Sequence, residues 1–325
     1  MKGPAYRIYR DGFPHHTYTR ATNGFIVFYS AEDCIYYLTL YSCLARRYKI
    51  RTLAFNIMPN HTHSEEEARD KESFLLFHDE LNAQFTQEYN RQHHRSGPLW
   101  DSPFGYAANT VAKRIRDTTC YIANNPVAGK IVKDILSFRW SLLPYYKNSH
   151  PFSEKIVLRH VSRPLRRAVD LVNHFHRHNL PLTYLRQSLI FKGLQKEERN
   201  QVIDWILSCY NFLDYKAVLS YYGGSFEQAC LSFRTHSGSD HDIPDDYDDY
   251  GIYVQMMSIL KRRRVNLEDC NFEKLPAAQS RKWTSLFREF GFRPKQIDRF
   301  LHQAHEPHSP VSLPPWQPNT WQTGI

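Results

Sequence analysis

The chain has 325 residues, 42% of them hydrophobic, which is long enough for two compact domains. Its 42 Lys and Arg outnumber 33 Asp and Glu, and the net charge of +9 favours a polyanionic partner such as nucleic acid. No run of about 20 apolar residues exists, which excludes a membrane-spanning helix, and the first residues lack the apolar centre of a signal peptide. Six scattered cysteines without a Cys-x-x-Cys pair indicate reduced thiols, so we expect a cytoplasmic protein.

The first half of the chain alternates short extended stretches with amphipathic helices. Apolar and aromatic runs indicate the strands, and capping residues followed by apolar side chains at helical spacing indicate the helices. The predicted elements are a strand at 25–28, a helix from Ser30 to about Arg47, an extended segment at 50–58, a helix at 72–93, a strand at 104–109 and a helix from Val111 that ends before Pro126. This order predicts an α+β fold with a mostly antiparallel sheet and flanking helices.

From about residue 149 the pattern becomes mainly helical. A linker near His150 leads to a helix that opens at Arg163. Two helices at 276–290 and 294–301, joined at Gly291, form either a helix-turn-helix or a plain helical hairpin. The final segment is rich in proline and is predicted to be disordered. We therefore expect three parts, which are a domain at 1–148, a helical accessory domain at 149–305 and a disordered tail at 306–325.

His61 and His63 are the first candidate site residues. In an extended chain the side chains at i and i+2 point the same way, so both imidazoles can bind one divalent metal. An isolated His-x-His pair is usually incidental, but this pair ends the run Met-Pro-Asn-His-Thr-His at 58–63. A divalent metal held by two neutral imidazoles would leave open positions for water and phosphate oxygens.

Tyr121 and Asn125 are the second candidate pair. They are four residues apart in a predicted helix and therefore lie on one face of it. A tyrosine beside a metal can attack phosphate, because the cation neutralises the charge that develops in the transition state. The structural alternatives are that Tyr121 is a core aromatic and that Asn125 ends the helix before Pro126.

Together these motifs resemble the HUH endonuclease superfamily, in particular the single-tyrosine transposases of insertion sequences, which include the REP-associated tyrosine transposases. The resemblance rests on five segments that occur in the family's order, at 15–20, 58–63, 89–100, 121–127 and 140–141. It implies an HUH-type, ferredoxin- or RRM-like antiparallel sheet in the 1–148 domain, with the histidine pair on a central strand.

The resemblance also implies a chemistry. Tyr121 would attack the phosphorus of single-stranded or hairpin DNA, form a 5′-phosphotyrosine link and release a 3′-hydroxyl for later strand transfer. His61, His63 and Asn125 would bind the divalent metal, Mg²⁺ or Mn²⁺. No P-loop glycine motif is present, so no nucleotide cofactor is expected. Relatives occur as monomers and as dimers, and a homodimer is one expectation.

One segment departs from the family pattern. After His63 the family continues with an apolar strand, whereas this chain has Ser64 and three glutamates at 65–67. Such a segment suits a helix N-terminus better than a buried strand, with Ser64 and Glu67 at capping-box spacing. Three acids beside a phosphate site would repel DNA unless one of them, Glu65 or Glu66, joins the metal site. Two alternatives therefore stay open, which are a catalytically silent DNA-hairpin-binding protein and a metal-dependent hydrolase that uses water.

The remaining candidates are cations that could contact DNA phosphates. Each cluster has the alternative of being an ordinary solvated face. The candidate DNA-binding residues are Arg20, Arg163, Arg166, Arg167, Lys261, Arg262, Arg263, Arg264, Lys295 and Arg299.

Overall fold

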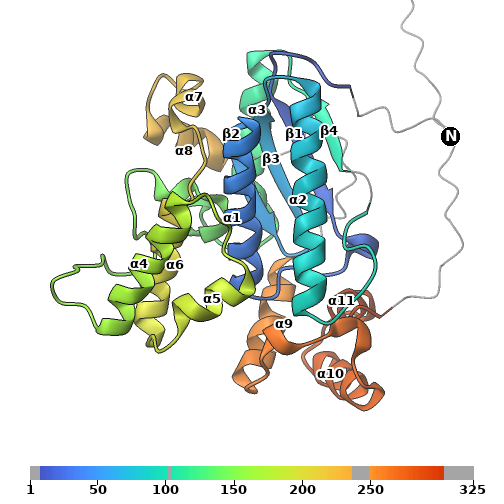
Figure 1. The fold of residues 1–325 in the computed structure, drawn as a ribbon. Coiled ribbons are helices and arrows are strands. Elements are labelled where there is room, and N and C mark those ends of the chain that lie inside the picture. The colour runs from blue at the N-terminus through green and yellow to red at the C-terminus, as the bar shows by residue number, and fades with distance from the viewer. Residues whose placement is uncertain (1–7, 102–103, 236–248, 304–325) are drawn as a thin grey trace, which may run out of the picture.

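The computed structural model describes residues 8–101, 104–235 and 249–303, and the predicted tail at 306–325 lies outside the described residues. Its centre is a four-stranded antiparallel sheet in the order β2-β3-β1-β4 (Figure 1). The strands are β1 (His15–Arg20), β2 (Arg51–Met58), β3 (His61–Glu67) and β4 (Gly105–Ala108). The predicted α+β class, with an antiparallel sheet and flanking helices, is confirmed.

Three long helices cover the two faces of this sheet. They are α1 (Ala31–Tyr48), α2 (Lys71–Gln92) and α3 (Ala112–Ala128). α1 and α2 lie side by side in front of the sheet in Figure 1, and α3 packs on β2 and β3 from behind. The predicted start of α1 is confirmed, because Ser30 and Asp33 form a reciprocal capping box.

Two predicted boundaries differ in the structure. Residues 25–28 are extended and largely buried but form no strand, because the amides of Val27 and Phe28 both donate to the Pro59 carbonyl. The extended segment at 50–58 is β2, but it does not carry the histidines. The chain turns at Pro59 and Asn60, and His61 begins the adjoining strand β3.

The prediction that 64–67 is a helix N-terminus is wrong. β3 runs to Glu67, and Glu65 and Glu66 are completely buried. Each carboxyl group meets a polar partner: Glu65 bonds Thr119, Glu66 bonds His78, and Glu67 pairs with Arg51. A buried acid is tolerated when its oxygens are hydrogen-bonded. The next helix begins after Asp70, whose carboxylate accepts from the Ser73 amide at 2.7 Å.

α3 does not end before Pro126 but continues to Ala128. A proline within a helix has no N–H for the carbonyl four residues earlier, here that of Ile122. In this structure the Asn56 side-chain amide on β2 donates to the Ile122 carbonyl at 2.6 Å. The sheet thus supplies the hydrogen bond that the proline removes, and the helix passes through.

The second half of the chain is mainly helical, as predicted. Its helices are α4 (Arg163–Arg177), α5 (Tyr184–Phe191), α6 (Lys196–Cys209), α7 (Tyr215–Ser220), α8 (Phe226–Thr235), α9 (Gly251–Arg262), α10 (Ala277–Glu289) and α11 (Pro294–Leu301). They pack as three groups: α4–α6 beside α1, α7 and α8 against α3, and α9–α11 against Ile26, Tyr29 and Met58. A separately folding domain at 149–305 stays a prediction.

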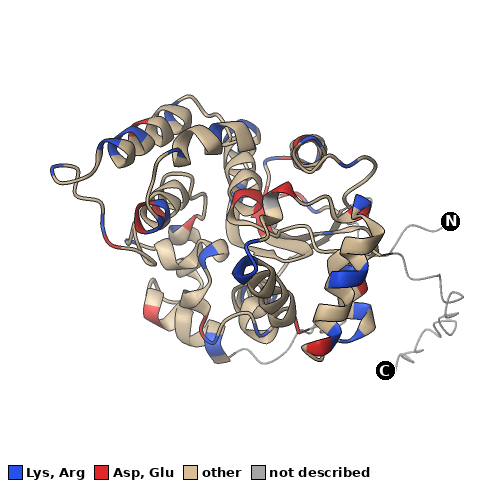
Figure 2. Ribbon diagram, turned by 90° about the horizontal axis from the view of Figure 1, so that it is seen from below, with Lys and Arg blue, Asp and Glu red and all other residues tan. Residues whose placement is uncertain are grey.

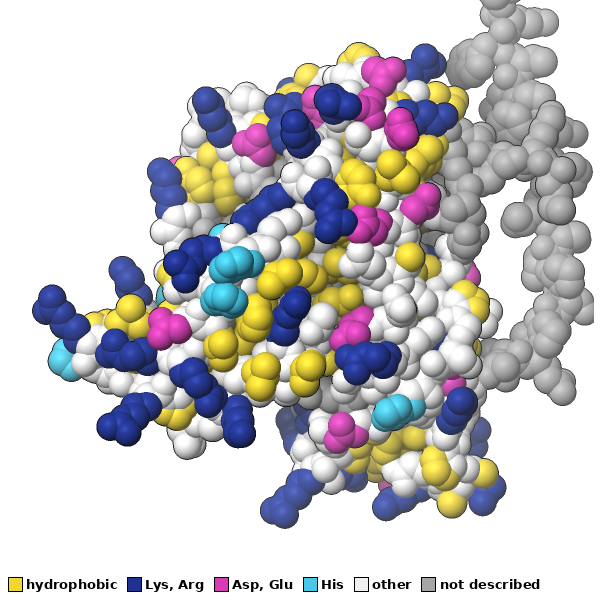
Figure 3. All heavy atoms as spheres, viewed as in Figure 1, with side chains coloured by type: hydrophobic (Ala, Val, Ile, Leu, Met, Phe, Trp, Pro, Cys, Tyr) yellow, Lys and Arg dark blue, Asp and Glu magenta, His cyan; other side chains and the backbone are white. Residues whose placement is uncertain are grey.

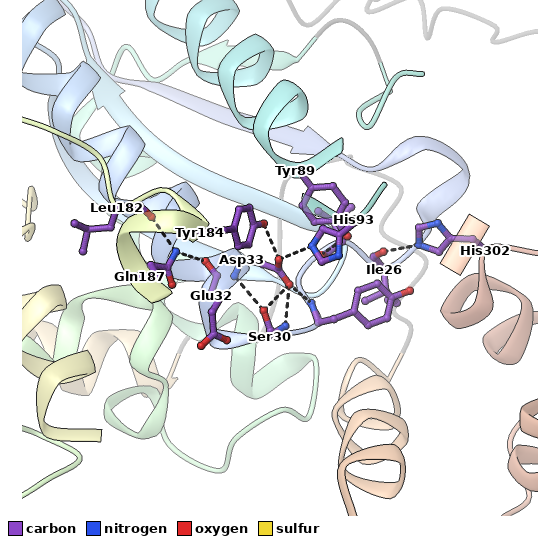
Figure 4. Close-up of polar contacts among 12 residues, drawn as sticks. Ile26, Ser30, Glu32, Asp33, Tyr89, His93, Leu182, Tyr184, Gln187 and His302 are labelled. Carbon is purple, nitrogen blue, oxygen red and sulfur yellow. Dashed lines mark hydrogen bonds and ion pairs between the residues drawn. The ribbon is translucent and has the colours of Figure 1, made fainter. Parts of the chain in front are cut away.

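A buried carboxylate ties the start of α1 to α2 and α5. Asp33 accepts hydrogen bonds from Ser30, from His93 at 2.9 Å and from Tyr184 at 2.7 Å (Figure 4). Burial alone would raise the pKa of Asp33, but His93 and the hydroxyl donors together hold it below its ordinary value. This cluster fixes the lower end of α1 in Figure 1, near α9–α11.

No helix among the described residues is both long and apolar enough to cross a membrane. All six cysteines are free thiols, in agreement with the predicted absence of disulfides.

Candidate functional site

The site lies on the sheet face that α3 covers. Paired residues of an antiparallel sheet point to the same side, and the register pairs Arg20 with His61, Tyr18 with His63, and His16 with Glu65. On the other side of β3, Asn56 pairs with His63. The predicted parity of the histidines is therefore observed: His61 and His63 share one face, and Thr62 points to the other, where its hydroxyl meets that of Tyr37.

The ring of Tyr121 lies against the histidines. The ring centroids of Tyr121 and His63 are 5.3 Å apart, and those of Tyr121 and His16 are 5.7 Å apart. The His61 and His63 centroids are separated by 4.8 Å. Tyr121 reaches this place because α3 turns one side towards the sheet, with Thr118, Ile122 and Asn125 buried on the same side. The fold thus joins residues that are about sixty positions apart in sequence.

His61 is oriented by the residue before it. The Nδ1 atom of His61 lies 2.6 Å from Oδ1 of Asn60, and the amide nitrogen of Asn60 donates to the Gly24 carbonyl at 3.0 Å. Because an amide oxygen only accepts, Nδ1 carries the hydrogen and Nε2 carries the lone pair. Nε2 is buried and has no hydrogen-bond partner among the described residues. Burial and the charge of Arg20 lower the pKa of His61 to about 3, so the ring is neutral.

The Nδ1 atom of His63 has a different partner from that of His61. It lies 3.0 Å from Nε2 of His16, so one of the two rings donates to the other. His16 belongs to β1, and the sequence indicates it only as part of the segment 15–20 that resembles the family pattern. The signal that could have found it is strand alternation, which places His16, Tyr18 and Arg20 on one face.

Two imidazoles at this spacing fit a divalent metal, and the Nε2 atom of the neutral His61 ring is a suitable donor. Among the described residues there is no group of three His, Cys, Asp or Glu that could hold a metal ion. Asn125, the third ligand that the family resemblance implies, is buried on the sheet-facing side of α3, one turn after Tyr121.

The second half of the chain closes the site. The ring of Tyr250 lies 5.3 Å from that of His61. The approach depends on two glycines, because Gly251 donates to the Gly129 carbonyl at 3.1 Å and a Cβ on Gly251 would lie 2.4 Å from the Lys130 carbonyl oxygen. Tyr121 is 8% exposed, His61 3% and His63 1%. Nothing in the sequence indicated Tyr250, since it lies 189 positions from His61.

The predicted DNA-binding cations lie in three places. Arg20 neighbours His61 across the strands, and the Arg299 side chain on α11 lies close to Gly24, the residue that holds Asn60. Lys295 is exposed on α11, and Lys261, Arg262, Arg263 and Arg264 are exposed at the end of α9. Arg163, Arg166 and Arg167 are exposed on α4, beside α1 and away from the α3 face.

No family model matches this chain, and no curated protein is significantly similar to it in sequence. One solved structure is similar, described as the structure of the REP-associated tyrosine transposase bound to a REP hairpin. The similarity has a TM-score of 0.37 and 20% sequence identity, and it covers 43% of this chain and 81% of that one. A likeness at this level carries no argument about function, which must come from the site itself.

Proposed function

We propose that this chain is an HUH-type single-tyrosine nuclease and strand transferase that acts on single-stranded or hairpin DNA. The observation that carries the proposal is the contact between Tyr121 and His63, whose ring centroids are 5.3 Å apart. The two residues come from different motifs, and only the family resemblance, not their spacing, predicted that they would meet.

In the proposed reaction the Tyr121 oxygen attacks phosphorus and loses its proton. The new bond joins tyrosine to the 5′-phosphate, while the bond to the 3′-oxygen breaks and that oxygen leaves as a hydroxyl. The phosphodiester energy is kept, so a different 3′-hydroxyl can reverse the step without ATP. Bound Mg²⁺ or Mn²⁺ would neutralise the phosphate oxygens. His61 and His63 would hold the metal, and Asn125 would complete the set.

The three glutamates at 65–67 do not prevent DNA from binding at the site. Glu66 points away from the site to the opposite face, and Glu67 pairs with Arg51 at the sheet margin. Glu65 is on the site face, but burial raises its pKa to about 8 and its oxygens meet Thr119 and Asn109. The repulsion expected from three free carboxylates is therefore largely removed.

The test uses a hairpin oligonucleotide labelled at its 3′ end, because a 5′-phosphotyrosine adduct retains that end. With Mn²⁺ we expect a labelled protein band that disappears with Tyr121→Phe and with His61→Ala. Tyr18→Phe is the matched control, because its ring also faces the pair, with its centroid 6.4 Å from that of His63. Equal adduct from Tyr121→Phe and the parent would refute the nucleophile assignment.

A second candidate is a catalytically silent DNA-hairpin-binding protein. The burial of Tyr121 and both histidines, together with the cover that Tyr250 provides, favours it. It predicts hairpin binding that is unaffected by EDTA and no adduct with any metal. The water-using hydrolase is distinguished in the same assay, since it would keep cleavage in Tyr121→Phe and lose it in His61→Ala.

A further inference from the structure

Two basic surfaces stand outside the site. The first lies over α4 and the adjoining end of α1, where Lys, Arg and His side chains gather (Figure 3). The residues that form this surface are Arg46, Arg47, Lys49, His174, His176, Arg177 and His178. It belongs to the α1 side of the molecule, whereas Tyr121 lies behind the sheet. A DNA strand at Tyr121 would have to pass around the sheet to reach it.

The second surface is formed by α9–α11, at the end of the molecule that Figure 2 views. The sequence at 249–303 contains eleven Lys and Arg against six Asp and Glu. Arg262, Arg263 and Arg264 are exposed at the end of α9, and Arg281 and Lys282 are exposed on α10. Such an excess of positive charge attracts the phosphate backbone of a nucleic acid.

α9–α11 are fixed to the end of the sheet at which β3 begins with His61. Tyr29 donates to the Phe300 carbonyl at 2.5 Å, and the Ile26 amide donates to the Arg299 carbonyl at 3.3 Å. The His302 ring meets the Ile26 carbonyl at 2.7 Å, as Figure 4 shows. These bonds, with Tyr250 against His61, place α9 and α11 next to the end of β3 at which His61 lies.

An exposed aromatic ring stands on this surface. Phe290, which follows α10, is 54% exposed; the Arg263 guanidinium carbon lies over its ring at 5.8 Å from the centroid, and the Phe292 ring is nearly parallel at a centroid distance of 6.5 Å. Arg288 and Arg293 are exposed nearby in the sequence. An apolar ring among cations offers a stacking face for an unpaired base and neighbouring contacts for phosphates. A duplex keeps its base faces stacked internally, so this ring suits a single strand.

We propose that Phe290 and Arg263 form a binding surface for single-stranded DNA that continues from the strand held at Tyr121. The proposal rests on the proposed DNA partner, but it does not depend on cleavage. Arg263 contacts a phosphate, and Phe290 stacks on a base. The surface therefore selects hairpins that carry an unpaired extension.

The experiment measures binding of the full-length Tyr121→Phe protein in EDTA, so that no covalent product forms. The probes are one fluorescent DNA hairpin that is blunt and the same hairpin with a 5′ or a 3′ single-stranded extension of about ten nucleotides. Phe290→Ser and Arg263→Gln are compared with Leu231→Ser on α8, where the side chain is 53% exposed, and with Arg177→Gln on α4. Thermal melting checks that each variant is folded.

We expect one extension to tighten binding, and both test variants to reduce this gain by about tenfold while leaving blunt-hairpin affinity unchanged. Arg263→Gln should also lower the salt dependence by roughly 0.7 of a logarithmic unit per decade, whereas Phe290→Ser should not. The proposal is overturned if both test variants keep the full gain, or if the two control variants lose it equally. If the test variants lose the gain from the extension but the parent protein, which has Tyr121, forms no covalent adduct, the binding surface is supported and the proposed catalysis is refuted.

Discussion

Glu65 and Glu66 are neighbours on β3, are both completely buried, and point to opposite faces of the sheet. On the α3 face, Glu65 meets Asn109 at 2.8 Å and Thr119 at 2.7 Å, and burial raises its pKa to about 8. On the α1–α2 face, burial would also raise the pKa of Glu66, but His78 and the hydroxyl donors hold it below its ordinary value. The surroundings therefore favour the protonated form of Glu65 on one face and the ionised form of Glu66 on the other.

The difference lies in what each covering layer brings to the strand. α2 supplies His78, and α1 and α2 together supply an aromatic core that contains Tyr41, Phe77 and Phe85. α3 supplies a threonine hydroxyl and the ring of Tyr121. The face with these partners is the one that carries the candidate site. Arg20 at the end of β1 is the charged group that lowers the pKa of His61, whereas the pKa of Glu65 is set by burial and by its hydrogen bonds to Thr119 and Asn109.

The largest expected effect comes from Glu66→Gln. The Glu66 carboxylate accepts from the hydroxyls of Tyr41 and Thr17. The NH₂ group of a glutamine would face these buried donors and leave one unsatisfied, so we expect the free energy of unfolding to fall by about 3 kcal/mol. Urea unfolding at pH 7 measures it. A loss as small as that of Glu65→Gln would show that the two faces do not differ.

The acid dependence of stability should follow Glu66. Because its folded pKa lies below its ordinary value of 4.5, its contribution is present above that pH and is lost as pH falls through the folded pKa. Unfolding measured from pH 6 down to pH 3 should therefore show a shallower decline for Glu66→Gln than for the parent. Parallel curves would contradict the assignment of Glu66 as the anion.

Asn56→Ala should have the next largest effect. It removes the side-chain amide that donates to the buried Ile122 carbonyl, which receives no backbone hydrogen bond from Pro126. We expect a loss of about 1–2 kcal/mol, faster hydrogen exchange in α3 and less Tyr121 adduct. Asn90→Ala is the control, since Asn90 also donates to a carbonyl, that of Gly97, but at the surface. Equal losses in the two variants would mean that Asn56 does not support α3.

Glu65→Gln should cost less than about 1 kcal/mol. The Thr119 hydroxyl lies 2.7 Å from both the Ile115 carbonyl and Glu65, and it has only one hydrogen. If that hydrogen goes to the carbonyl, Glu65 must carry a proton of its own, and glutamine can donate in its place. Urea unfolding that shows a loss comparable with Glu66→Gln would mean that Glu65 is charged.

The smallest effect is expected for Glu67→Gln, at the margin of both faces. Glu67 pairs with Arg51, but the side chains are 25% and 49% exposed, so water and salt weaken the attraction. We expect a change within about 0.5 kcal/mol in the same unfolding assay. A larger change would show that the margin of the sheet behaves like its buried faces.

The comparison of the two faces also explains what sequence could predict. α1, α2 and β2 follow from capping residues and local periodicity, which act over a few positions. The shared face of His61 and His63 follows from strand alternation. The strand at 65–66 could not be predicted in this way, because a run of acids normally indicates a solvent-exposed segment. Its burial depends on hydrogen bonds to Thr119, Asn109 and His78, which are distant in sequence.

Site residues that depend on distant packing were equally hidden. The meeting of Tyr121 with His63 came only from family resemblance, and the roles of both residues stay predictions. The passage of α3 through Pro126 depends on Asn56, seventy positions earlier. Tyr250 reaches His61 through a contact between two glycines that no local pattern announces.

That glycine contact restricts how the protein can be shortened. A fragment that stops near residue 148 would uncover Ile26, Tyr29 and Met58, which now pack against α9–α11, and such a bare apolar patch promotes aggregation. The same cut would remove Tyr250, whose ring lies beside that of His61, and expose the candidate site to water. An assay of a truncated chain would thus report on a differently shaped site. A substitution as small as Gly251→Ala, by pressing on the Lys130 carbonyl, would disturb the same site from the second half of the chain.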